Sequence, residues 1–293
     1  MSIAVVGAGA VGTLFAANWA ANGHAVTVCA RRGFSSFAVE SPVRAVELPA
    51  RVVTSPDELP APFDWVVVSV KAHQTAGVAG WLSRACGPST AVLVLQNGLE
   101  AVERAQPLAP ESTIYPGVVR CVAELIEPGR VRHGSGNEIV LPDADTTRRF
   151  AESFSGPGSV IAAVADFDVQ LWTKLAANIA ANGLMALTDH SSEVLRDDAI
   201  ADLARALVAE CWTVGAALGV AVDPARAELL VRSITDLPVY GTSMLHDRRA
   251  GRPLEHDALH GALTRAARAK GIATPVTDVV HALLAALDPA RGW

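Results

Sequence analysis

An amine and two amides recur at regular spacing within an otherwise apolar segment of the chain. Lys174, Asn178 and Asn182 lie in Phe167–Leu187, where the spacing of the apolar residues predicts a helix. Because they follow one another at intervals of four, the three side chains line one face of that helix. Burying them is costly unless a polar ligand satisfies them, so the pattern indicates a binding face. The alternative is an exposed helix face with the lysine amine extended into water.

A glycine-rich motif near the amino terminus has the spacing of a dinucleotide-binding turn. It follows the apolar run Ser2–Val6, which predicts a buried strand, and precedes a helical pattern that ends at Gly23. In this context the three glycines permit a tight turn, close approach of a pyrophosphate, and close packing of helix on strand. Free N–H groups at the helix start would hold the phosphates. The predicted cofactor-binding residues are Gly7, Ala8, Gly9, Ala10, Val11 and Gly12.

The end of the next predicted strand indicates which dinucleotide is bound. Ala25–Ala30 ends in Arg31 and Arg32, and the next acidic residue is Glu40. An NAD site would place a carboxylate here for the ribose 2′-hydroxyl, whereas guanidinium groups suit the 2′-phosphate of NADP. The pair therefore predicts NADP, without showing which arginine contacts the phosphate. The alternative is a solvated arginine pair.

Two further predicted strands end next to polar residues. Trp65–Val70 is followed by Lys71, and Ala91–Leu95 by a Gln-Asn-Gly sequence that contains Asn97. Ligands of open α/β sheets bind outside the carboxyl ends of the strands, so Lys71 and Asn97 are expected to line the nicotinamide side of a cleft. Asn-Gly is also a common turn signal, and a lysine can simply close a strand.

The second half of the chain is dominated by helical periodicity. Short apolar pieces from Ile114 to Leu141 predict hairpins that complete the sheet, followed by helix Thr146–Phe154 and strand Val160–Val164. The predicted fold is α/β, with an N-terminal Rossmann-type parallel-sheet domain (1–165) followed by an all-helical C-terminal domain (166–293). The helices predicted in the second domain are Phe167–Leu187, Asp197–Leu218, Pro224–Ile234, Leu254–Ala269 and Pro275–Leu287.

A chemically dense loop interrupts these helices. Tyr240–Asp257 contains Ser243 and Glu255, which are candidates for ligand contacts if the loop returns to the cleft. The alternative is structural, with the Ser243 hydroxyl or that of Thr242 capping a helix. In that case Asp247 pairs with one of the nearby arginines, Arg248, Arg249 and Arg252.

Composition excludes several classes of protein. With 293 residues, 51% hydrophobic and 18% charged, the chain has the make-up of a compact globular protein. A formal net charge of -6 without a long basic run argues against nucleic-acid binding. The apolar amino terminus lacks a basic flank and is interrupted by glycines, so neither a signal peptide nor a membrane span is expected. The four cysteines lack metal-ligand spacing, so we predict no metal site and a reduced, cytoplasmic protein.

Together these motifs resemble the ketopantoate reductases (2-dehydropantoate 2-reductases) over nearly the whole chain. The resemblance implies NADPH-dependent reduction of a small 2-oxo acid to a 2-hydroxy acid, by default ketopantoate to pantoate in pantothenate biosynthesis. It also implies a homodimer through the helical half. The matching motifs are GAGAVG, VKAHQT around Lys71, QNGLE around Asn97, PGRVRHG at Pro128–Gly134, W-x-K-x-x-x-N-x-x-x-N from Trp172 to Asn182, and TSMLHDRRAGRPLEHD from Thr242 to Asp257.

The resemblance assigns roles to single residues. Lys174 resembles the catalytic lysine, which supplies a proton to the keto oxygen as hydride reaches the carbon. Glu255 resembles the glutamate that supports substrate binding near the lysine, and we count it with the catalytic and cofactor-side residues. The matched substrate-binding residues are Asn97, Asn178, Asn182 and Ser243, and the matched cofactor-binding residues beyond the glycine turn are Arg31, Lys71 and Asn97.

Four positions depart from the family pattern. Gly183 stands where the family often has proline, and Ser192 stands near the position at which many members have a further substrate-side asparagine. His246 replaces the glutamine before the motif aspartate, and His256 follows the glutamate. These changes leave the chemistry intact but leave the substrate open. The alternatives are a reductase of a different 2-oxo acid or ketone in a specialised pathway, or a non-catalytic NADP-binding sensor.

Overall fold

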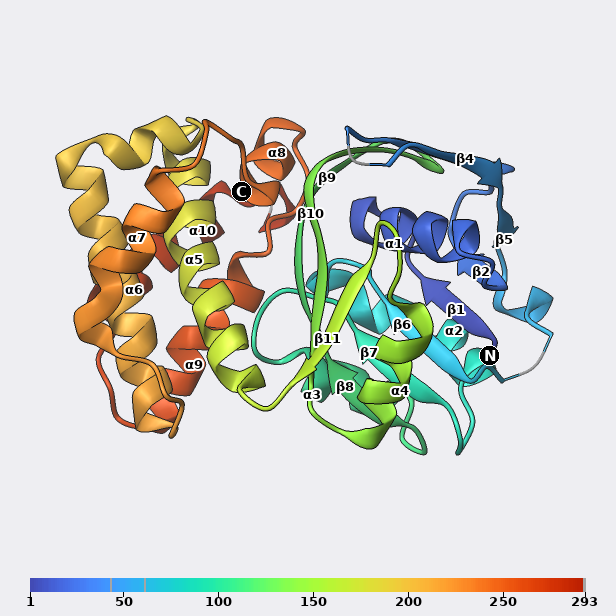
Figure 1. Ribbon diagram of the computed structural model, residues 1–293. Coiled ribbons are helices and arrows are strands. Elements are labelled where there is room, and N and C mark those ends of the chain that lie inside the picture. Colours follow the sequence, from blue (N-terminus) through green and yellow to red (C-terminus); the bar gives the residue numbers. More distant parts are fainter. Residues whose placement is uncertain (43, 61, 292–293) are drawn as a thin grey trace. The chain divides into compact units, whose positions relative to one another are not determined.

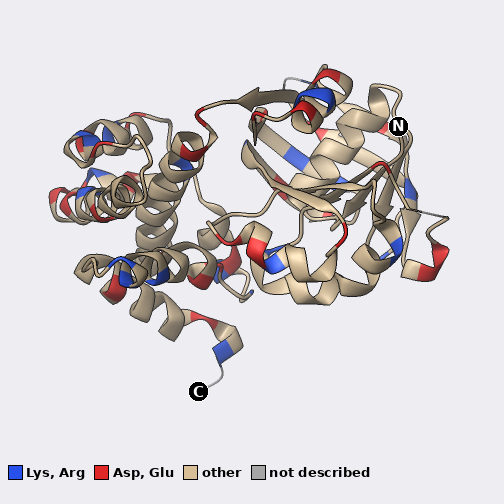
Figure 2. Ribbon diagram, turned by 90° about the horizontal axis from the view of Figure 1, so that it is seen from below, with Lys and Arg blue, Asp and Glu red and all other residues tan. Residues whose placement is uncertain are grey.

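The computed structural model describes residues 1–42, 44–60 and 62–291, which form two compact units (Figure 1). Unit 1 comprises Met1–Gln96 and Ala101–Phe167, and unit 2 comprises Asn97–Glu100 and Asp168–Trp293. The short segment 97–100 therefore packs with unit 2, although the chain on both sides of it belongs to unit 1. Acidic and basic positions are interspersed along both units, without a long basic run (Figure 2).

A six-stranded parallel sheet forms the centre of unit 1, with the strand order β5-β2-β1-β6-β7-β8. Every residue of β1, β2, β6 and β7 is buried, as expected for apolar strands covered on both faces. The carboxyl ends of these four strands are aligned, because Val6 pairs with Cys29 and Val68, and Val68 pairs with Val94. The strands are β1 (Ile3–Val6), β2 (Val26–Cys29), β5 (Arg51–Val53), β6 (Trp65–Val68), β7 (Ala91–Val94) and β8 (Thr113–Pro116).

Helices cover both faces of this sheet (Figure 1). Successive residues of β1 face opposite sides, so that Ile3 belongs to the apolar cluster around Trp19 and Ala4 belongs to the cluster around Leu82. Trp19 comes from α1 and Leu82 from α2. The helical segments of unit 1 are α1 (Ala10–Ala21), η1 (Pro56–Glu58), η2 (Ala72–Val78), α2 (Ala79–Ala85), α3 (Ala101–Ala105), η3 (Gln106–Leu108) and α4 (Asp145–Phe154).

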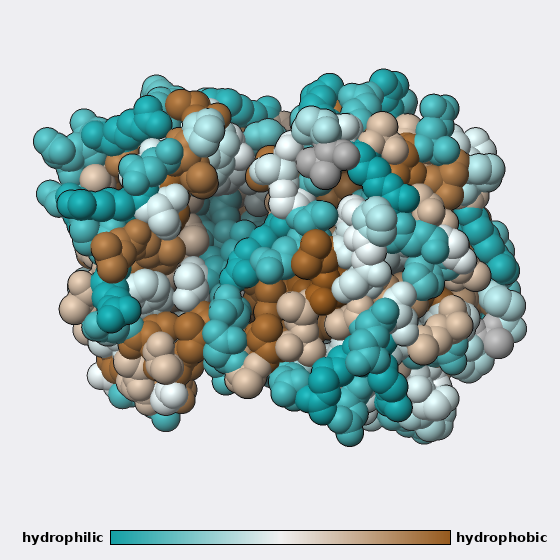
Figure 3. All heavy atoms as spheres, viewed as in Figure 1, coloured by the Kyte–Doolittle hydropathy of each residue, from teal (hydrophilic) through white to brown (hydrophobic). Residues whose placement is uncertain are grey.

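A second, mixed sheet packs on the other side of α1. Phe37, Val131 and Ile139 of this sheet lie in the same cluster as Trp19. Its opposite face exposes apolar side chains such as Val122 and Val160, and Figure 3 shows apolar side chains at the surface over β10 and β11. The strands are β3 (Ser36–Glu40), β4 (Val46–Pro49), β9 (Val118–Glu127), β10 (Arg130–Pro142) and β11 (Val160–Val164), in the order β11-β10-β3-β4 with β9 paired to β10.

The prediction that the hairpins after Ile114 complete the first sheet was therefore wrong for all but β8. The antiparallel pair β9–β10 belongs to the second sheet, because the 13-residue β10 also pairs with β3 and β11. These long-range pairings bury the inner face of β10 on α1 instead of extending the parallel sheet.

Unit 2 contains helices and no strand among its described residues. The predicted helices are confirmed, with Asp197 as the N-cap of α6, but Leu254–Ala269 is only helical from His256 onwards and begins with a π-helical turn. The helical segments are α5 (Phe167–Thr188), η4 (Ser192–Arg196), α6 (Asp198–Ala217), η5 (Pro224–Arg226), α7 (Ala227–Thr235), α8 (Ser243–Arg249), η6 (Asp257–Gly261), α9 (Ala262–Ala269), α10 (Pro275–Leu287) and η7 (Pro289–Arg291).

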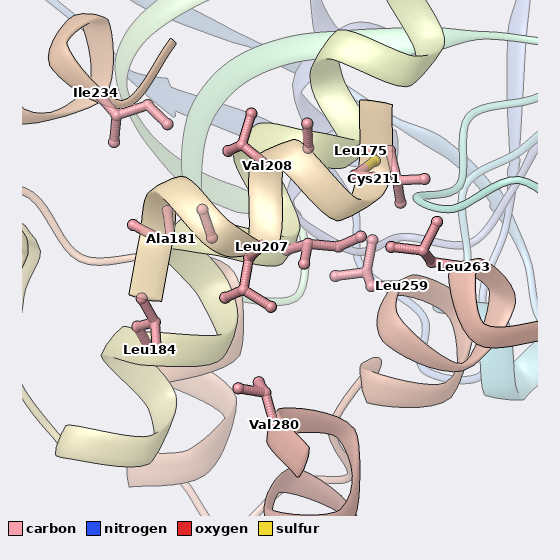
Figure 4. Close-up of a cluster of buried hydrophobic side chains, with 14 of the residues drawn as sticks. Leu175, Ala181, Leu184, Leu207, Val208, Cys211, Ile234, Leu259, Leu263 and Val280 are labelled. Carbon is pink, nitrogen blue, oxygen red and sulfur yellow. The ribbon is translucent and has the colours of Figure 1, made fainter. Parts of the chain in front are cut away.

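The core of unit 2 lies between α5 and α6 and extends to the carboxyl-terminal helices. Leu175 of α5, Leu207 and Cys211 of α6, and Leu259 and Leu263 near α9 belong to one buried cluster (Figure 4). This packing holds the apolar side of α5, so its polar side is available for other contacts. Within the described residues, no helix combines the length and the apolar content needed to span a bilayer.

Candidate active site

The glycine turn after β1 is too tightly packed to accept side chains at two of its three glycines. Gly7 has φ +112°, and its amide donates to the Cys29 carbonyl over 3.0 Å. A Cβ at Gly12 would lie 2.0 Å from the Gly7 carbonyl oxygen and 2.3 Å from the Ser69 hydroxyl. The Ser69 hydroxyl in turn donates to the Gly7 carbonyl over 2.8 Å. The turn is thus held from inside by backbone contacts and by Ser69, which the sequence analysis did not single out.

The start of α1 fits an anionic group. A Cβ at Gly9 would meet nothing closer than a backbone oxygen at 4.0 Å, so the space in front of this residue is open. Gly9 is the N-cap of α1, where no side chain caps the helix and no acidic residue occupies the first turn. Uncapped N–H groups and the helix dipole attract negative charge, so this turn can hold the pyrophosphate of a dinucleotide.

The two arginines after β2 are available for an anion. Arg31 and Arg32 are both exposed, and neither makes a hydrogen bond or an ion pair within the residues that the structure describes. The strand ends at Cys29, so both guanidiniums follow the carboxyl end of a strand next to β1. This is the position at which the ribose 2′ group of a dinucleotide is recognised.

Lys71 follows the carboxyl end of β6 and is braced by the next strand. The buried Gln96 side chain donates to the Val70 carbonyl over 2.9 Å and to the Thr75 hydroxyl over 2.8 Å. The Gln96 amide also lies 3.5 Å from the Lys71 carbonyl oxygen. Gln96 therefore fixes the backbone on which the half-buried Lys71 stands. The sequence analysis did not predict a role for Gln96, although its position immediately before Asn97 could have indicated one.

The polar face of α5 is partly buried. Lys174 and Asn178 are half-buried, whereas Asn182 is only 4% exposed. The side-chain oxygen of Asn182 is buried and accepts no hydrogen bond from the described residues. Because an unsatisfied buried acceptor costs about 1–3 kcal/mol, a hydroxyl or ammonium donor from a bound molecule would stabilise it. This favours the binding face over the solvated alternative.

Three of the candidate residues are linked by hydrogen bonds, although they are far apart in the sequence. The Asn178 amide donates to the Asn97 side-chain oxygen over 3.3 Å, and the Asn97 amide donates to a Glu255 carboxylate oxygen over 3.4 Å. Glu255 is buried, with 6% exposure. A buried carboxylate, two amides and a lysine one turn away on α5 form a polar site within unit 2. All of these residues belong to unit 2, including Asn97.

The residues on both sides of Glu255 contact the carboxyl-terminal segment, Leu254 through its backbone amide and His256 through its side chain. One Asp288 carboxylate oxygen accepts from the Leu254 amide over 3.3 Å and lies 3.2 Å from Nε2 of His256. The other oxygen accepts from the Ala290 amide over 2.9 Å. Burial lowers the pKa of His256, despite the opposing effect of Asp288, so its neutral form is favoured. Asp288 and His256 therefore support the position of Glu255.

Ser243 is the exposed first residue of α8, and its hydroxyl makes no hydrogen bond within the described part of the chain. Thr242 caps this helix instead, since its hydroxyl accepts from the Leu245 amide over 3.4 Å. Two arginines attach α8 to the end of α5, with Arg248 donating to the Ala186 carbonyl and Arg249 pairing with Asp189 at 2.7 Å. The loop thus returns to the helix that carries Lys174.

Two of the remaining loop and family positions have structural partners. The buried Asp247 carboxylate pairs with Arg252 at 2.8 Å, as the structural alternative expected. Ser192 is 2% exposed, and its hydroxyl accepts from the Tyr240 amide over 3.0 Å. No three His, Cys, Asp or Glu side chains of the described residues are grouped as metal ligands.

The fold and the site define a class of protein. A parallel sheet with a glycine turn before an uncapped helix, joined to a helical unit with a lysine, amides and a buried carboxylate, is typical of dinucleotide-dependent oxidoreductases. Residues 3–146 match the family described as ketopantoate reductase PanE/ApbA, and residues 166–288 match its C-terminal domain.

Similar proteins extend over the whole chain. The 2-dehydropantoate 2-reductase of Mycobacterium tuberculosis is 39% identical over 292 residues, covering 99% of both chains. That of Caulobacter vibrioides is 38% identical over 286 residues, covering 97% of this chain and 98% of the other. The crystal structure of 2-dehydropantoate 2-reductase from Geobacter metallireducens has a TM-score of 0.91, with 28% identity, and covers 97% of this chain and 99% of that one. The chain therefore belongs to the ketopantoate reductase family of oxidoreductases, and the predicted family and α/β fold are confirmed.

Proposed function

We propose that this protein reduces a small 2-oxo acid to the 2-hydroxy acid with NADPH, and that 2-dehydropantoate (ketopantoate) is its substrate. The observation that carries the proposal is the hydrogen-bonded set of Asn178, Asn97 and Glu255, in which Asn178 lies on the same face of α5 as Lys174. The relatives named 2-dehydropantoate 2-reductase support this choice of substrate.

Each residue of the site has a chemical task in this proposal. Bound NADPH would supply the hydride that adds to the keto carbon. Lys174 holds a proton at Nζ and gives it to the keto oxygen, leaving a neutral amine that regains a proton from water. Asn178, Asn182 and Ser243 bind the hydroxyl and carboxylate groups of the substrate. Glu255 accepts a hydrogen bond from the Asn97 amide and keeps the site polar.

The proposed cofactor residues belong to unit 1, except Asn97, which belongs to unit 2. The glycine turn Gly7–Gly12 takes the pyrophosphate at the start of α1, and Arg31 takes the 2′-phosphate, which selects NADPH over NADH. Lys71 and Asn97 lie on the nicotinamide side. We further propose that residues 1–165 act as the cofactor domain and residues 166–293 as the substrate domain. The homodimer stays a prediction that sedimentation velocity can check.

The decisive assay mixes the purified protein with NADPH and ketopantoate and follows the NADPH absorbance. Replacing Lys174 by Ala should lower kcat on the order of 10²–10⁴-fold, because a positioned proton donor contributes about that much. NADPH binding should be retained. Lys270→Ala is the matched control, because Lys270 is an exposed lysine at the end of α9. Unchanged turnover of Lys174→Ala would refute the assigned proton donor.

The cofactor preference has a separate test. Arg31→Ala should weaken the binding of NADPH much more than the binding of NADH. Measuring Arg32→Ala in the same way shows which guanidinium contacts the 2′-phosphate. Equal losses for both cofactors in both variants would remove the argument for 2′-phosphate recognition.

A second candidate is the same reaction on a different 2-oxo acid. The observation that favours it is Ser192, which stands near the position of a substrate-side asparagine in other members of the family. In this chain the Ser192 side chain is buried, and its hydroxyl accepts from the Tyr240 amide. Slow NADPH oxidation with ketopantoate, but fast oxidation with another member of a 2-oxo acid panel, would support this candidate. No oxidation with any of them would support the NADP-binding sensor.

A further inference from the structure

The segment Asn97–Glu100 follows strand β7 of unit 1 but is packed against unit 2. Gly98 has φ +96°, and a Cβ there would lie 2.1 Å from the carbonyl oxygen of Ala258 in η6. The next residue, Leu99, packs against the hydrophobic core of unit 2. Only glycine allows the backbone to come this close to η6. The segment is therefore seated on the turn that follows Glu255.

One guanidinium group connects this segment to the same turn. Arg265 of α9 contacts both Glu100 carboxylate oxygens, with Nε at 2.7 Å and Nη2 at 2.8 Å. Its Nη1 lies 2.7 Å from the Asp257 carboxylate, and Nη2 also donates to the Asp257 carbonyl over 3.1 Å. The hydrogen bond from Arg265 holds the pKa of Asp257 below its usual value. A planar guanidinium bound at both ends has a fixed orientation.

The lengths of the hydrogen bonds show which contacts hold the segment in place. The two bonds of the Asn97 side chain measure 3.3 and 3.4 Å, longer than the usual range for N–H···O bonds. Those between Arg265 and Glu100 are 2.7 and 2.8 Å and charge-assisted. The Asn97 side chain is therefore held by weak hydrogen bonds, whereas its segment is held firmly three residues further along, at Glu100.

We propose that Arg265 is a positioning residue for Asn97. By holding Glu100 against Asp257, it keeps segment 97–100 on unit 2 and keeps the Asn97 amide between Asn178 and Glu255. The kinetic consequence rests on the proposed function, in which Asn97 contacts the substrate and the cofactor. The seating of the segment does not depend on that function.

The experiment compares Arg265→Gln, Glu100→Gln and the double variant with the wild type. Hydrogen–deuterium exchange in a peptide covering 97–100 should rise in all three. In the kinetic assay, kcat/KM should fall on the order of ten- to a hundredfold, because a displacement of about 1 Å of a positioning group has such effects. The double variant should be no worse than Arg265→Gln alone, because that single change already removes the contact with Glu100. Arg265→Lys, which keeps the charge without the fork, should recover only part of the activity.

Arg232→Gln is the matched control. Arg232 forms a 2.6 Å pair with Glu228 in α7 and is likewise exposed, but it holds no segment of the site. It should leave both the exchange at 97–100 and the kinetics unchanged. Unchanged exchange in Arg265→Gln and Glu100→Gln would overturn the proposal. So would raised exchange with wild-type kinetics. A wild-type protein that reduces no 2-oxo acid would refute the proposed function alone, because the exchange result stands independently.

Discussion

Replacing Gly183 by Ala tests the packing behind the polar face of α5. Gly183 follows Asn182 and faces the buried imidazole of His260, whose Nε2 lies 3.1 Å from the Ile179 carbonyl oxygen. A Cβ at position 183 would lie 2.6 Å from that Nε2 and 3.2 Å from a methyl group of Val280. Real Cβ atoms do not approach neighbours this closely, so the imidazole must move. His260 is fully buried, and because protein interiors are closely packed, its movement displaces neighbouring side chains.

Three contributions decide whether Gly183→Ala lowers or raises the free energy of unfolding. Overpacking a buried site costs roughly 1–3 kcal/mol, and weakening the bond between His260 and Ile179 costs about 1 kcal/mol. Alanine gains about 1 kcal/mol over glycine in a helix interior. The expected net loss of stability is therefore about 1–3 kcal/mol. Since 1 kcal/mol shifts the Tm of a domain by about 2–4 °C, Tm should fall by roughly 2–12 °C.

Calorimetric unfolding of Gly183→Ala and of Gly80→Ala supplies the test and its control. Gly80 is an exposed glycine in α2, where a Cβ would make only an ordinary contact of 3.5 Å with Pro56. Gly80→Ala should therefore raise the stability by up to about 1 kcal/mol. The double variant Gly183→Ala/His260→Ala should lose less than the sum of its single changes, because each relieves the other. A Gly183→Ala protein at least as stable as the wild type would refute the reasoning.

Three more changes have definite expected outcomes. Gly12→Ala should weaken NADPH binding at least tenfold in a fluorescence titration, because its Cβ would lie 2.0 Å from the Gly7 carbonyl oxygen; wild-type affinity would contradict this. Asp197→Ala should lower the free energy of unfolding in urea by about 1 kcal/mol, since its carboxylate caps α6; no change would argue against the cap. Burial lowers the pKa of His260 from 6.5 to about 3, so the unfolded chain binds more protons and stability falls as pH drops below 6.5. His260→Gln should reduce that loss between pH 7 and 5 by at most about 1.4 kcal/mol per pH unit, and an unchanged slope would exclude His260 as its source.

The four central strands of the parallel sheet, β2, β1, β6 and β7, were predictable because they are apolar and fully buried. Four-residue runs such as Ala91–Val94 leave little choice but a strand covered on both faces. Strands β3 and β4 gave no such signal, because β3 alternates exposed and buried residues and β4 has only one buried residue. The place of β3 depends on its pairing with β10, in which Ala38 meets Arg130, and β4 pairs in turn with β3. A local sequence pattern does not indicate which distant strand will pair with it.

Of the candidate site, the sequence predicted as a group only those residues that lie on a single helix. Lys174, Asn178 and Asn182 are visible as a set because one helix spaces them. Asn97 was expected at the edge of the sheet, since it follows a strand, and the structure binds its side chain to Asn178 and Glu255 of unit 2. These partners are 81 and 158 residues away in the sequence. A strand end predicts a location, but the segment 97–100 that follows the strand belongs to unit 2.

The π-helical turn η6 gives these contacts a common origin. A π turn widens the helix by one residue, and here its successive groups contact different parts of unit 2. The Asp257 carboxylate holds Arg265, the Ala258 carbonyl faces Gly98, and the His260 imidazole contacts α5 at Ile179. A regular α-helical turn would place these three groups at different angles around the helix axis. The turn begins two residues after Glu255, so the irregular backbone couples the carboxylate, the segment that carries Asn97 and the helix that carries Lys174.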